Sequence, residues 1–138
     1  MRDSKDVRRT PTPSVSQLRC SPPSPRTRRE GTAFIARLTE ALGPKGVSTD
    51  AHEIEPHVKD WRGRWNGSTP VLVKPSTTEE CATALTLAAA YGLPVTPQGG
   101  NSGLVYGGVP YGDVLVSLKR MNRVREVDPL NDAMTLEE

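Results

Sequence analysis

The chain has 138 residues, about the length of one domain, and 35% of them are hydrophobic. Its formal net charge of +2 is unevenly spread. Residues 1–30 carry eight basic and three acidic side chains (+5), whereas the remainder carries ten basic and thirteen acidic ones (−3). No stretch approaches the roughly 18 apolar residues of a membrane span, and no secretory apolar region is present. We therefore expect one folded unit with no membrane span.

The basic segment 1–30 is predicted to be a disordered tail, and the folded part is predicted to cover residues 31–138. The tail holds five prolines and five serines, and it cannot bury enough apolar surface to offset its ordering entropy. A solvated tail, a misplaced start codon, an organelle-targeting segment and a nucleic-acid-binding arm remain alternatives. Asp3 and Asp6 argue against targeting, because transit peptides avoid acids.

The two cysteines, Cys20 and Cys81, are far apart and match no ligand spacing. They therefore make neither a disulfide framework nor a zinc site. This pattern favours a reduced, cytoplasmic protein.

The first expected element of the folded part is a helix over residues 32–42, ended by Gly43-Pro44. Its apolar face consists of Phe34, Ile35, Leu38, Ala41 and Leu42. A charged stretch then leads into residues 61–67, a turn-prone segment that carries both tryptophans.

A strand–helix–strand unit follows. Residues 71–73 and 94–96 are short apolar runs typical of strands, and strands joined by a helical crossover form a parallel pair. Two overlapping capping boxes begin the intervening helix, namely Ser76 with Glu79 and Thr77 with Glu80. The helix runs to Tyr91, and Gly92 ends it. The side chains expected to be buried are Cys81, Leu85 and Ala88.

Three more strands are predicted toward the end of the chain. Residues 113–118 form an apolar strand, whereas 123–127 and 133–137 alternate in polarity and flank a turn, as in an antiparallel hairpin. The fold class is therefore α+β, with a small parallel βαβ core plus an antiparallel hairpin. Because Glu138 directly follows a strand with no cap or turn, we expect the sequence to be truncated.

The chemistry is concentrated in a glycine-rich loop that directly follows the second strand. Half of the twelve glycines fall between positions 99 and 112, and no Lys or Arg occurs from Gln98 to Leu118. Glycines allow positive φ angles and remove the Cβ that would keep a ligand away, and successive backbone amides can form an anion-binding nest. The loop lacks the pattern of a P-loop and the GxGxxG of a Rossmann fold. A diphosphate held by N–H donors fits, and a surface loop without a ligand is the alternative.

Several motifs, in order and in register over roughly residues 50–138, resemble a known family. They are Asp60-Trp61-Arg62-Gly63, Val73-Lys74-Pro75-Ser76-Thr77-Thr78-Glu79-Glu80, Pro97-Gln98-Gly99-Gly100-Asn101-Ser102-Gly103-Leu104-Val105, Ser117-Leu118-Lys119-Arg120-Met121-Asn122-Arg123 and Glu126-Val127-Asp128-Pro129. Together they resemble the vanillyl-alcohol-oxidase-type (PCMH-type) FAD-binding domain of FAD-linked oxidases. Within that superfamily the chain is most similar to the D-2-hydroxyglutarate and D-lactate dehydrogenase branch.

The resemblance implies which residues bind the cofactor. The family loop wraps the FAD diphosphate, so this role is expected for Pro97, Gln98, Gly99, Gly100, Asn101, Ser102, Gly103 and Leu104. Asn101 stands where relatives with covalently attached flavin have histidine, so attachment is expected to be non-covalent. Tyr106 occupies a position where family members often have glycine, which is a departure from the family loop.

The resemblance also implies a function. The full-length enzyme would be an FAD-dependent oxidoreductase acting on a CH–OH donor, with a small-molecule D-2-hydroxy acid and an electron acceptor as partners and without nucleic acid. In the family, the catalytic residues, the metal ligands and the second half of the FAD site lie beyond position 138. We therefore predict no catalytic residue here and an inactive fragment. A stand-alone nucleotide-diphosphate-binding module and a non-catalytic gene remnant are the alternatives.

Other candidate sites carry weaker signals. His52, Glu53, Glu55 and His57 match no zinc spacing, and we interpret them as solvated side chains. Trp61 and Trp65 are expected to pack against the core. Cys81 is expected to be an inert packing residue.

Overall fold

The computed structural model describes residues 25–137, with side chains described from residue 31 onward. Residues 1–24, and with them Cys20 and most of the expected tail, lie outside the described residues. Helix α1 (Pro25–Leu42) begins within the segment expected to be disordered. Pro25 stands in the first helical turn, where a missing N–H costs nothing, so a proline is compatible with this start.

A four-stranded sheet forms the centre of the molecule, in the order β1-β2-β4-β3. Its strands are β1 (Val47–Ser48), β2 (Leu72–Val73), β3 (Val95–Gln98) and β4 (Val114–Ser117). β1 is antiparallel to β2, and β4 is parallel to both β2 and β3. The expected parallel strands β2 and β3 are therefore present, but they do not pair directly, because β4 lies between them.

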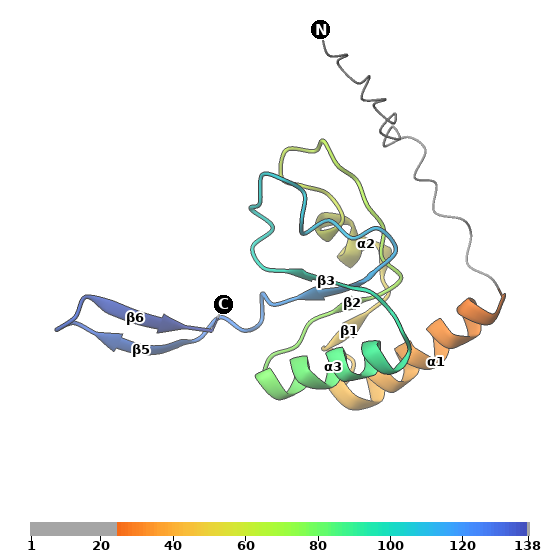
Figure 1. Cartoon of the computed structure of the whole chain (residues 1–138), viewed down its shortest axis with the longest axis horizontal. Coiled ribbons are helices and arrows are strands. Elements are labelled where there is room, and N and C mark those ends of the chain that lie inside the picture. Colours follow the sequence, from red (N-terminus) through yellow and green to blue (C-terminus); the bar gives the residue numbers. More distant parts are fainter. Residues whose placement is uncertain (1–24, 138) are drawn as a thin grey trace, which may run out of the picture.

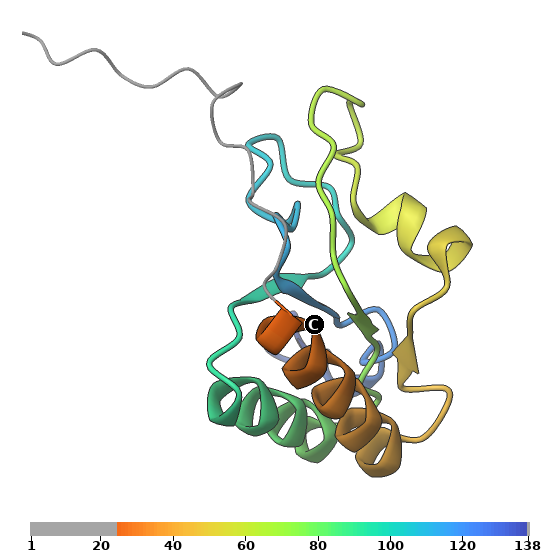
Figure 2. The ribbon, with the colours of Figure 1, turned by 90° about the vertical axis from the view of Figure 1, so that its right-hand side faces the viewer.

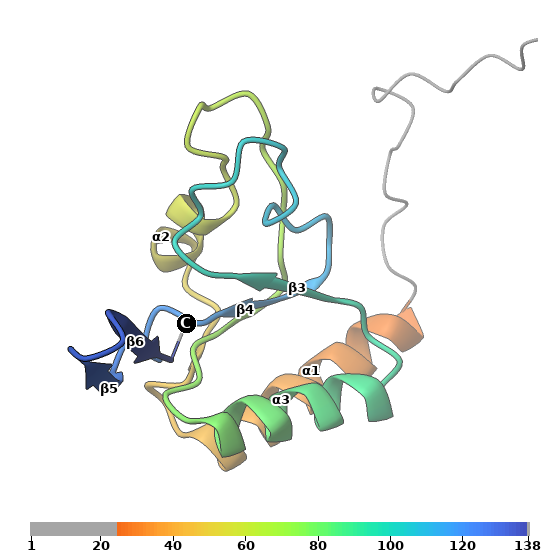
Figure 3. The same ribbon diagram turned by 60° about the vertical axis from the view of Figure 1, so that its left-hand side comes forward.

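Two helices cover one face of this sheet. α1 and α3 (Thr78–Ala90) lie side by side there, whereas α2 (Ala51–Ile54), the short helix η2 (Glu55–His57) and the long loops lie on the other side (Figures 1 and 3). The α3 crossover and the loop between β3 and β4 thus run on opposite sides of the sheet. This arrangement separates a packed side from a loop side.

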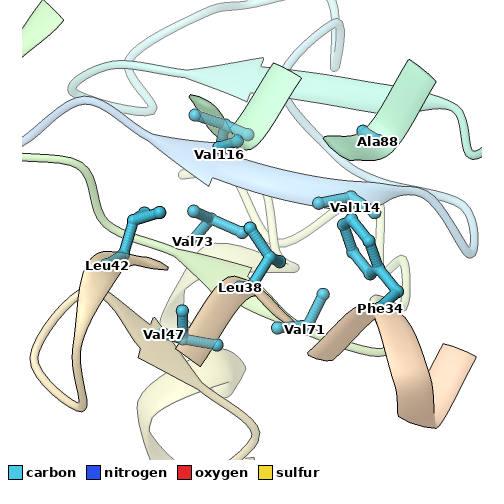
Figure 4. Close-up of a cluster of buried hydrophobic side chains, with 10 residues drawn as sticks. Phe34, Leu38, Leu42, Val47, Val71, Val73, Ala88, Val114 and Val116 are labelled. Carbon is cyan, nitrogen blue, oxygen red and sulfur yellow. The ribbon is translucent and has the colours of Figure 1, made fainter. Parts of the chain in front are cut away.

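The hydrophobic core fills the space between the two helices and the sheet (Figure 4). Phe34, Leu38 and Leu42 of α1 face the sheet, as their spacing predicts, whereas Ala41 is exposed. The core side chains of the strands are Val47, Val71, Val73, Val114 and Val116. The rings of Phe34 and Tyr91 lie 5.5 Å apart and join the two helices.

Helix α3 begins with the expected cap, although its inward face differs from the expected one. Thr77 is the N-cap residue and accepts a hydrogen bond from the backbone N–H of Glu80 at 3.2 Å. The Glu80 carboxylate accepts from the backbone N–H and hydroxyl of Ser76, at 2.6 and 2.9 Å. The helix buries Ala84 and Ala88, with Cys81 packed against the core as predicted, whereas Leu85 is 45% exposed. The prediction that Leu85 is buried was wrong, because Ala84 rather than Leu85 faces the core.

The antiparallel hairpin consists of β5 (Val124–Asp128) and β6 (Ala133–Leu136) and extends away from the sheet (Figure 1). Asp128 closes its turn by accepting from the backbone N–H groups of Leu130 and Asn131, at 3.0 and 3.2 Å. The strands are exposed on both faces rather than half-exposed as expected. The hairpin is therefore held by its own ladder and turn rather than by burial.

Candidate functional site

A pocket of about 330 Å³ lies on the loop side of the sheet. Its lining residues are Asp60, Pro97, Gln98, Gly99, Gly100, Asn101, Ser102, Gly103, Tyr106 and Gly108. Seven of the eight residues predicted to form the site are among them; Leu104 is not, and it is 60% exposed. The structure thus brings the predicted loop together around one cavity.

The loop approaches the pocket from the end of a sheet strand. Pro97 and Gln98 are the last residues of β3, and the irregular loop begins at Gly99. The Leu118 N–H donates to the Gln98 carbonyl oxygen at 2.9 Å, which ties the loop's starting point to the sheet. The glycine loop and the segment from η2 to β2 both lie on the side away from α1 and α3 (Figure 2).

The backbone of the glycine loop presents hydrogen-bond donors that have no protein partner. Between Gly99 and Gly108, no backbone N–H donates a hydrogen bond to another described residue. The pocket lining contains no Lys or Arg. Any anion in this pocket would therefore be held by amide dipoles, as in a backbone nest, rather than by full positive charges.

The glycines between residues 99 and 108 do not adopt the left-handed conformation that glycine permits. Asn101 (φ 56°) and Tyr106 (φ 53°) adopt it instead, as does Gly112 at the end of the loop. An Asn tolerates this conformation better than most residues because its short side chain can hydrogen-bond locally. A Cβ at Gly100 would lie 4.0 Å from its nearest neighbour, Oγ of Ser102, and one at Gly103 would have no neighbour within 4 Å. These two glycines therefore leave the pocket wall open to a ligand.

Two carboxamide side chains fasten the loop to the segment at residues 57–59. Gln98 is buried, and its Nε2 donates to the carbonyl oxygens of His57 and Gly108, both at 2.8 Å. Its Oε1 lies 2.6 Å from Nδ1 of His57, which donates to it. Asn101 Nδ2 donates to the Lys59 carbonyl oxygen at 2.8 Å. The loop is therefore held in place by side-chain hydrogen bonds, whereas its backbone N–H groups between Gly99 and Gly108 donate none to the described residues.

Tyr106, the departure from the family loop, contacts the segment that carries the tryptophans. Its ring lies 4.2 Å from that of Trp65, with an interplanar angle of 35°. Tyr106 adopts the left-handed backbone that glycine adopts without strain, at the position where the resemblance leads us to expect glycine. Trp61 is 61% exposed, with the Arg62 guanidinium 5.3 Å from its ring centroid. The expectation that Trp61 packs against the core was wrong.

Asp60 contributes a buried carboxylate to the pocket. Its residue is 7% exposed, and its Oδ1 accepts from the backbone N–H of Trp65 at 2.7 Å. The backbone N–H of Asp60 donates to the Trp65 carbonyl oxygen at 3.2 Å. Asp60 therefore closes the turn at residues 60–65 and lines the pocket at the same time.

The charged residues before this turn have separate partners. Glu53 pairs with Lys74 at 3.0 Å and Glu55 with Lys59 at 2.7 Å. Hydrogen bonding from Ser48 and the Lys74 ammonium lower the pKa of Glu53, and Lys59 lowers that of Glu55. Among the described residues, no group of three or more His, Cys, Asp or Glu side chains is placed to bind a metal ion.

Three pocket residues were not predicted as site residues, namely Asp60, Tyr106 and Gly108. The sequence did single out Asp60, as part of an upstream motif, and Tyr106, as a substitution within the loop. Neither position carried a signal of contact with residues 97–103. Their convergence depends on the Gln98 and Asn101 hydrogen bonds, which span about 40 residues of sequence.

Comparison with known proteins gives concordant matches. Residues 69–138 match the model of a family described as an FAD binding domain. The chain is 38% identical over 104 residues to a probable mitochondrial D-2-hydroxyglutarate dehydrogenase of Oryza sativa subsp. indica, covering 75% of this chain and 19% of that protein. It is 41% identical over 86 residues to the mitochondrial D-2-hydroxyglutarate dehydrogenase of Bos taurus, covering 62% of this chain and 16% of that protein. The chain thus spans about a fifth of the length of these relatives.

Solved structures confirm the predicted fold class. p-Cresol methylhydroxylase aligns with a TM-score of 0.68 at 20% identity, over 75% of this chain and 21% of that one. The 4-ethylphenol oxidase of Gulosibacter chungangensis aligns with a TM-score of 0.62 at 28% identity, over 72% of this chain and 20% of that one. The fold is that of part of a PCMH-type FAD-binding domain, with the parallel core and antiparallel hairpin that were expected.

Two findings bear on location. Within residues 25–137, no helix is both long and apolar enough to cross a membrane. The matched D-2-hydroxyglutarate dehydrogenases are named as mitochondrial proteins. The cytoplasmic location stays a prediction.

Proposed function

Because the chain belongs to the FAD-binding-domain family, we propose that residues 97–104 bind the diphosphate of FAD as part of a D-2-hydroxy acid dehydrogenase. The observation that carries this proposal is the row of backbone N–H groups from Gly99 to Gly108 that have no partner among the described residues. A diphosphate needs directed donors at several oxygens, and successive amides in a loop supply them.

The residues present fit such a group. Gly100 and Gly103 leave open space where a Cβ would stand, so a phosphate can approach the backbone closely. Gln98 and Asn101 hold the loop in place through their side chains while its N–H groups stay free. The donors are therefore ordered before a ligand arrives, which lowers the entropic cost of binding.

Attachment of the flavin is proposed to be non-covalent. The nitrogen of the Asn101 carboxamide is not nucleophilic, because its lone pair is delocalised, and it is already engaged with the Lys59 carbonyl oxygen. Histidine at this position, as in relatives with covalently attached flavin, would offer a nucleophilic ring nitrogen. Acid precipitation of flavin-loaded protein should leave all of the flavin in the supernatant. Yellow colour retained in the pellet would contradict this.

The substrate follows from the relatives. Several of them are named D-2-hydroxyglutarate dehydrogenase and one a putative D-lactate dehydrogenase, so a D-2-hydroxy acid is the proposed substrate and a separate electron acceptor the second partner. Bound FAD would supply the hydride acceptor for oxidation of the acid to a 2-oxo acid. The part assigned to this chain is to bind and orient the cofactor's diphosphate.

Two alanine substitutions within the same loop test the proposal. Gly103 lines the pocket and Gly107 does not, and a Cβ at either position meets nothing within 4 Å. Neither Gly103→Ala nor Gly107→Ala should therefore disturb the fold. FAD titrated into the ¹⁵N-labelled chain should shift the amide resonances of residues 99–104, with a Kd of about a millimolar or weaker for a chain that spans a fifth of its relatives.

Gly103→Ala should weaken FAD binding by about tenfold, since the added methyl group would stand beside the backbone N–H groups proposed to hold the diphosphate. Gly107→Ala should leave the affinity unchanged. Equal affinities of the two variants, or amide shifts confined to other parts of the chain, would contradict the assignment of the diphosphate site.

A further inference from the structure

A negatively charged side chain such as that of Asp60 is unexpected in a pocket that binds an anion. It is the one charged residue among those that line the pocket, it is more than nine-tenths buried, and its charge has the same sign as a phosphate. Like charges at close range in a partly desolvated site repel each other more strongly than in water. A pocket built for diphosphate alone would not be expected to contain this side chain.

The local turn uses only one of the two carboxylate oxygens of Asp60. Oδ1 accepts from the Trp65 N–H, and the Asp60 carbonyl oxygen accepts from the Gly63 N–H at 2.9 Å. An asparagine could close the same turn, because its carbonyl oxygen accepts equally well. The turn therefore does not require the negative charge.

The second carboxylate oxygen of Asp60, Oδ2, has no hydrogen-bond partner among the described residues. No fully buried side-chain oxygen or nitrogen among the described residues lacks a partner. Oδ2 is therefore not fully buried, and Asp60 is one of the residues that line the pocket. An ionised carboxylate accepts hydrogen bonds and donates none, so its natural ligand partner is a hydroxyl or amine.

We propose that Asp60 is a specificity-determining residue that accepts a hydrogen bond from a sugar hydroxyl beside the diphosphate. The pocket then has two parts, the N–H donors of the glycine loop for the diphosphate and the Asp60 carboxylate for a neighbouring hydroxyl. FAD carries both ribose and ribityl hydroxyls next to its diphosphate, whereas inorganic pyrophosphate has no such group. The carboxylate thus favours the dinucleotide and repels the bare anion. This inference rests on the proposed diphosphate site.

The test uses the full chain, with FAD and inorganic pyrophosphate as separate probes. Asp60→Asn keeps the acceptor for the Trp65 N–H and removes the charge. FAD binding should weaken by about tenfold, because hydrogen bonds to charged groups are stronger than neutral ones. Pyrophosphate binding should instead strengthen severalfold. Asp113→Asn is the matched control, since it removes one charge outside the pocket lining and keeps an acceptor for Thr96, now 2.7 Å from Asp113; both affinities should stay unchanged.

The outcomes separate the two proposals. If FAD shifts the loop amides of the wild-type chain but Asp60→Asn changes both affinities in the same direction or not at all, Asp60 has no selective role and the diphosphate site stands. If FAD does not shift the loop amides at all, both proposals fail. Asp60→Glu keeps the charge and moves the acceptor, so it should weaken FAD binding while pyrophosphate binding stays weak. This second variant decides the matter should Asp60→Asn not fold.

ADP as a third probe distinguishes the two kinds of hydroxyl. ADP has a ribose and no ribityl chain. Weaker binding of ADP to Asp60→Asn than to the wild-type chain assigns the ribose hydroxyls, and an effect confined to FAD assigns the ribityl hydroxyls. Stronger ADP binding together with stronger FAD binding would overturn the proposal.

Discussion

The two sides of the central sheet are held together by different forces. On the helix side, apolar side chains of α1, α3 and the strands interlock with little water access. On the loop side, the glycine loop is fastened mainly by the side chains of Gln98 and Asn101. Stability and ligand binding should therefore respond to different substitutions. A protein that places its free backbone donors on the less packed side can keep them accessible without weakening its core.

The largest effect is expected on the helix side. Leu38 is fully buried, so Leu38→Ala should lower the free energy of unfolding by about 2–5 kcal/mol through lost burial and a cavity. Leu85→Ala makes the same chemical change at an exposed position of α3 and should cost about 0.5 kcal/mol or less. Urea denaturation of both variants measures the difference. Similar losses would mean that the core does not lie where the structure places it.

A smaller effect is expected at Gln98, which ends β3 and precedes the glycine loop. Gln98→Ala leaves the carbonyl oxygens of His57 and Gly108 without their donor and should cost about 1–3 kcal/mol. It should also increase the picosecond-to-nanosecond motion of residues 99–108, seen as lower ¹⁵N order parameters. Asn101→Asp removes the donor of a single exposed hydrogen bond, keeps a residue that tolerates the left-handed backbone, and should change both quantities less. Unchanged loop order in Gln98→Ala would show that other contacts hold the loop.

The smallest effect concerns the start of α3. Hydrogen bonds from the backbone and hydroxyl of Ser76 lower the pKa of Glu80 below its usual 4.5. A carboxyl whose folded pKa is depressed stabilises the fold above its unfolded pKa, and this contribution is lost as pH falls through the lower, folded value. Glu80→Gln should therefore flatten the decline in stability below about pH 4.5. Glu40→Gln, on the exposed side of α1, also removes one carboxylate and serves as the matched control.

The helix side was largely predictable from the sequence. The spacing of Phe34, Leu38 and Leu42 identifies the inward face of α1, and the capping residue Thr77 identifies the start of α3. The inward face of α3 was harder to identify, because its many alanines give weak contrast and Leu85 is the larger apolar residue. The position of β4 between β2 and β3 is a long-range property that no local pattern contains.

On the loop side, most of the pocket residues were predictable from the sequence, but their geometry was not. Glycine content and the resemblance located residues 97–103, which line one pocket. Between residues 97 and 108 the left-handed residues are Asn101 and Tyr106, and the glycines there remove side chains rather than supply positive φ angles. Asp60 lies beside the loop because hydrogen bonds join residues 57–59 to Gln98 and Asn101, about 40 residues later in the sequence. A local sequence pattern does not reveal such long-range hydrogen bonds.

The order of strands in the sheet has a consequence for synthesis of the chain. β4 is the last of the four strands to be made, yet β3 pairs with it alone and β2 needs it for its parallel partner. On the ribosome, β2 can pair with β1 once both have emerged, whereas β3 has no strand to join until residues 114–117 emerge from the exit tunnel. The glycine loop, which connects β3 to β4, closes in the same event. A nascent chain stalled before β4 should thus be bound by chaperones, whereas one stalled after it should resist proteolysis.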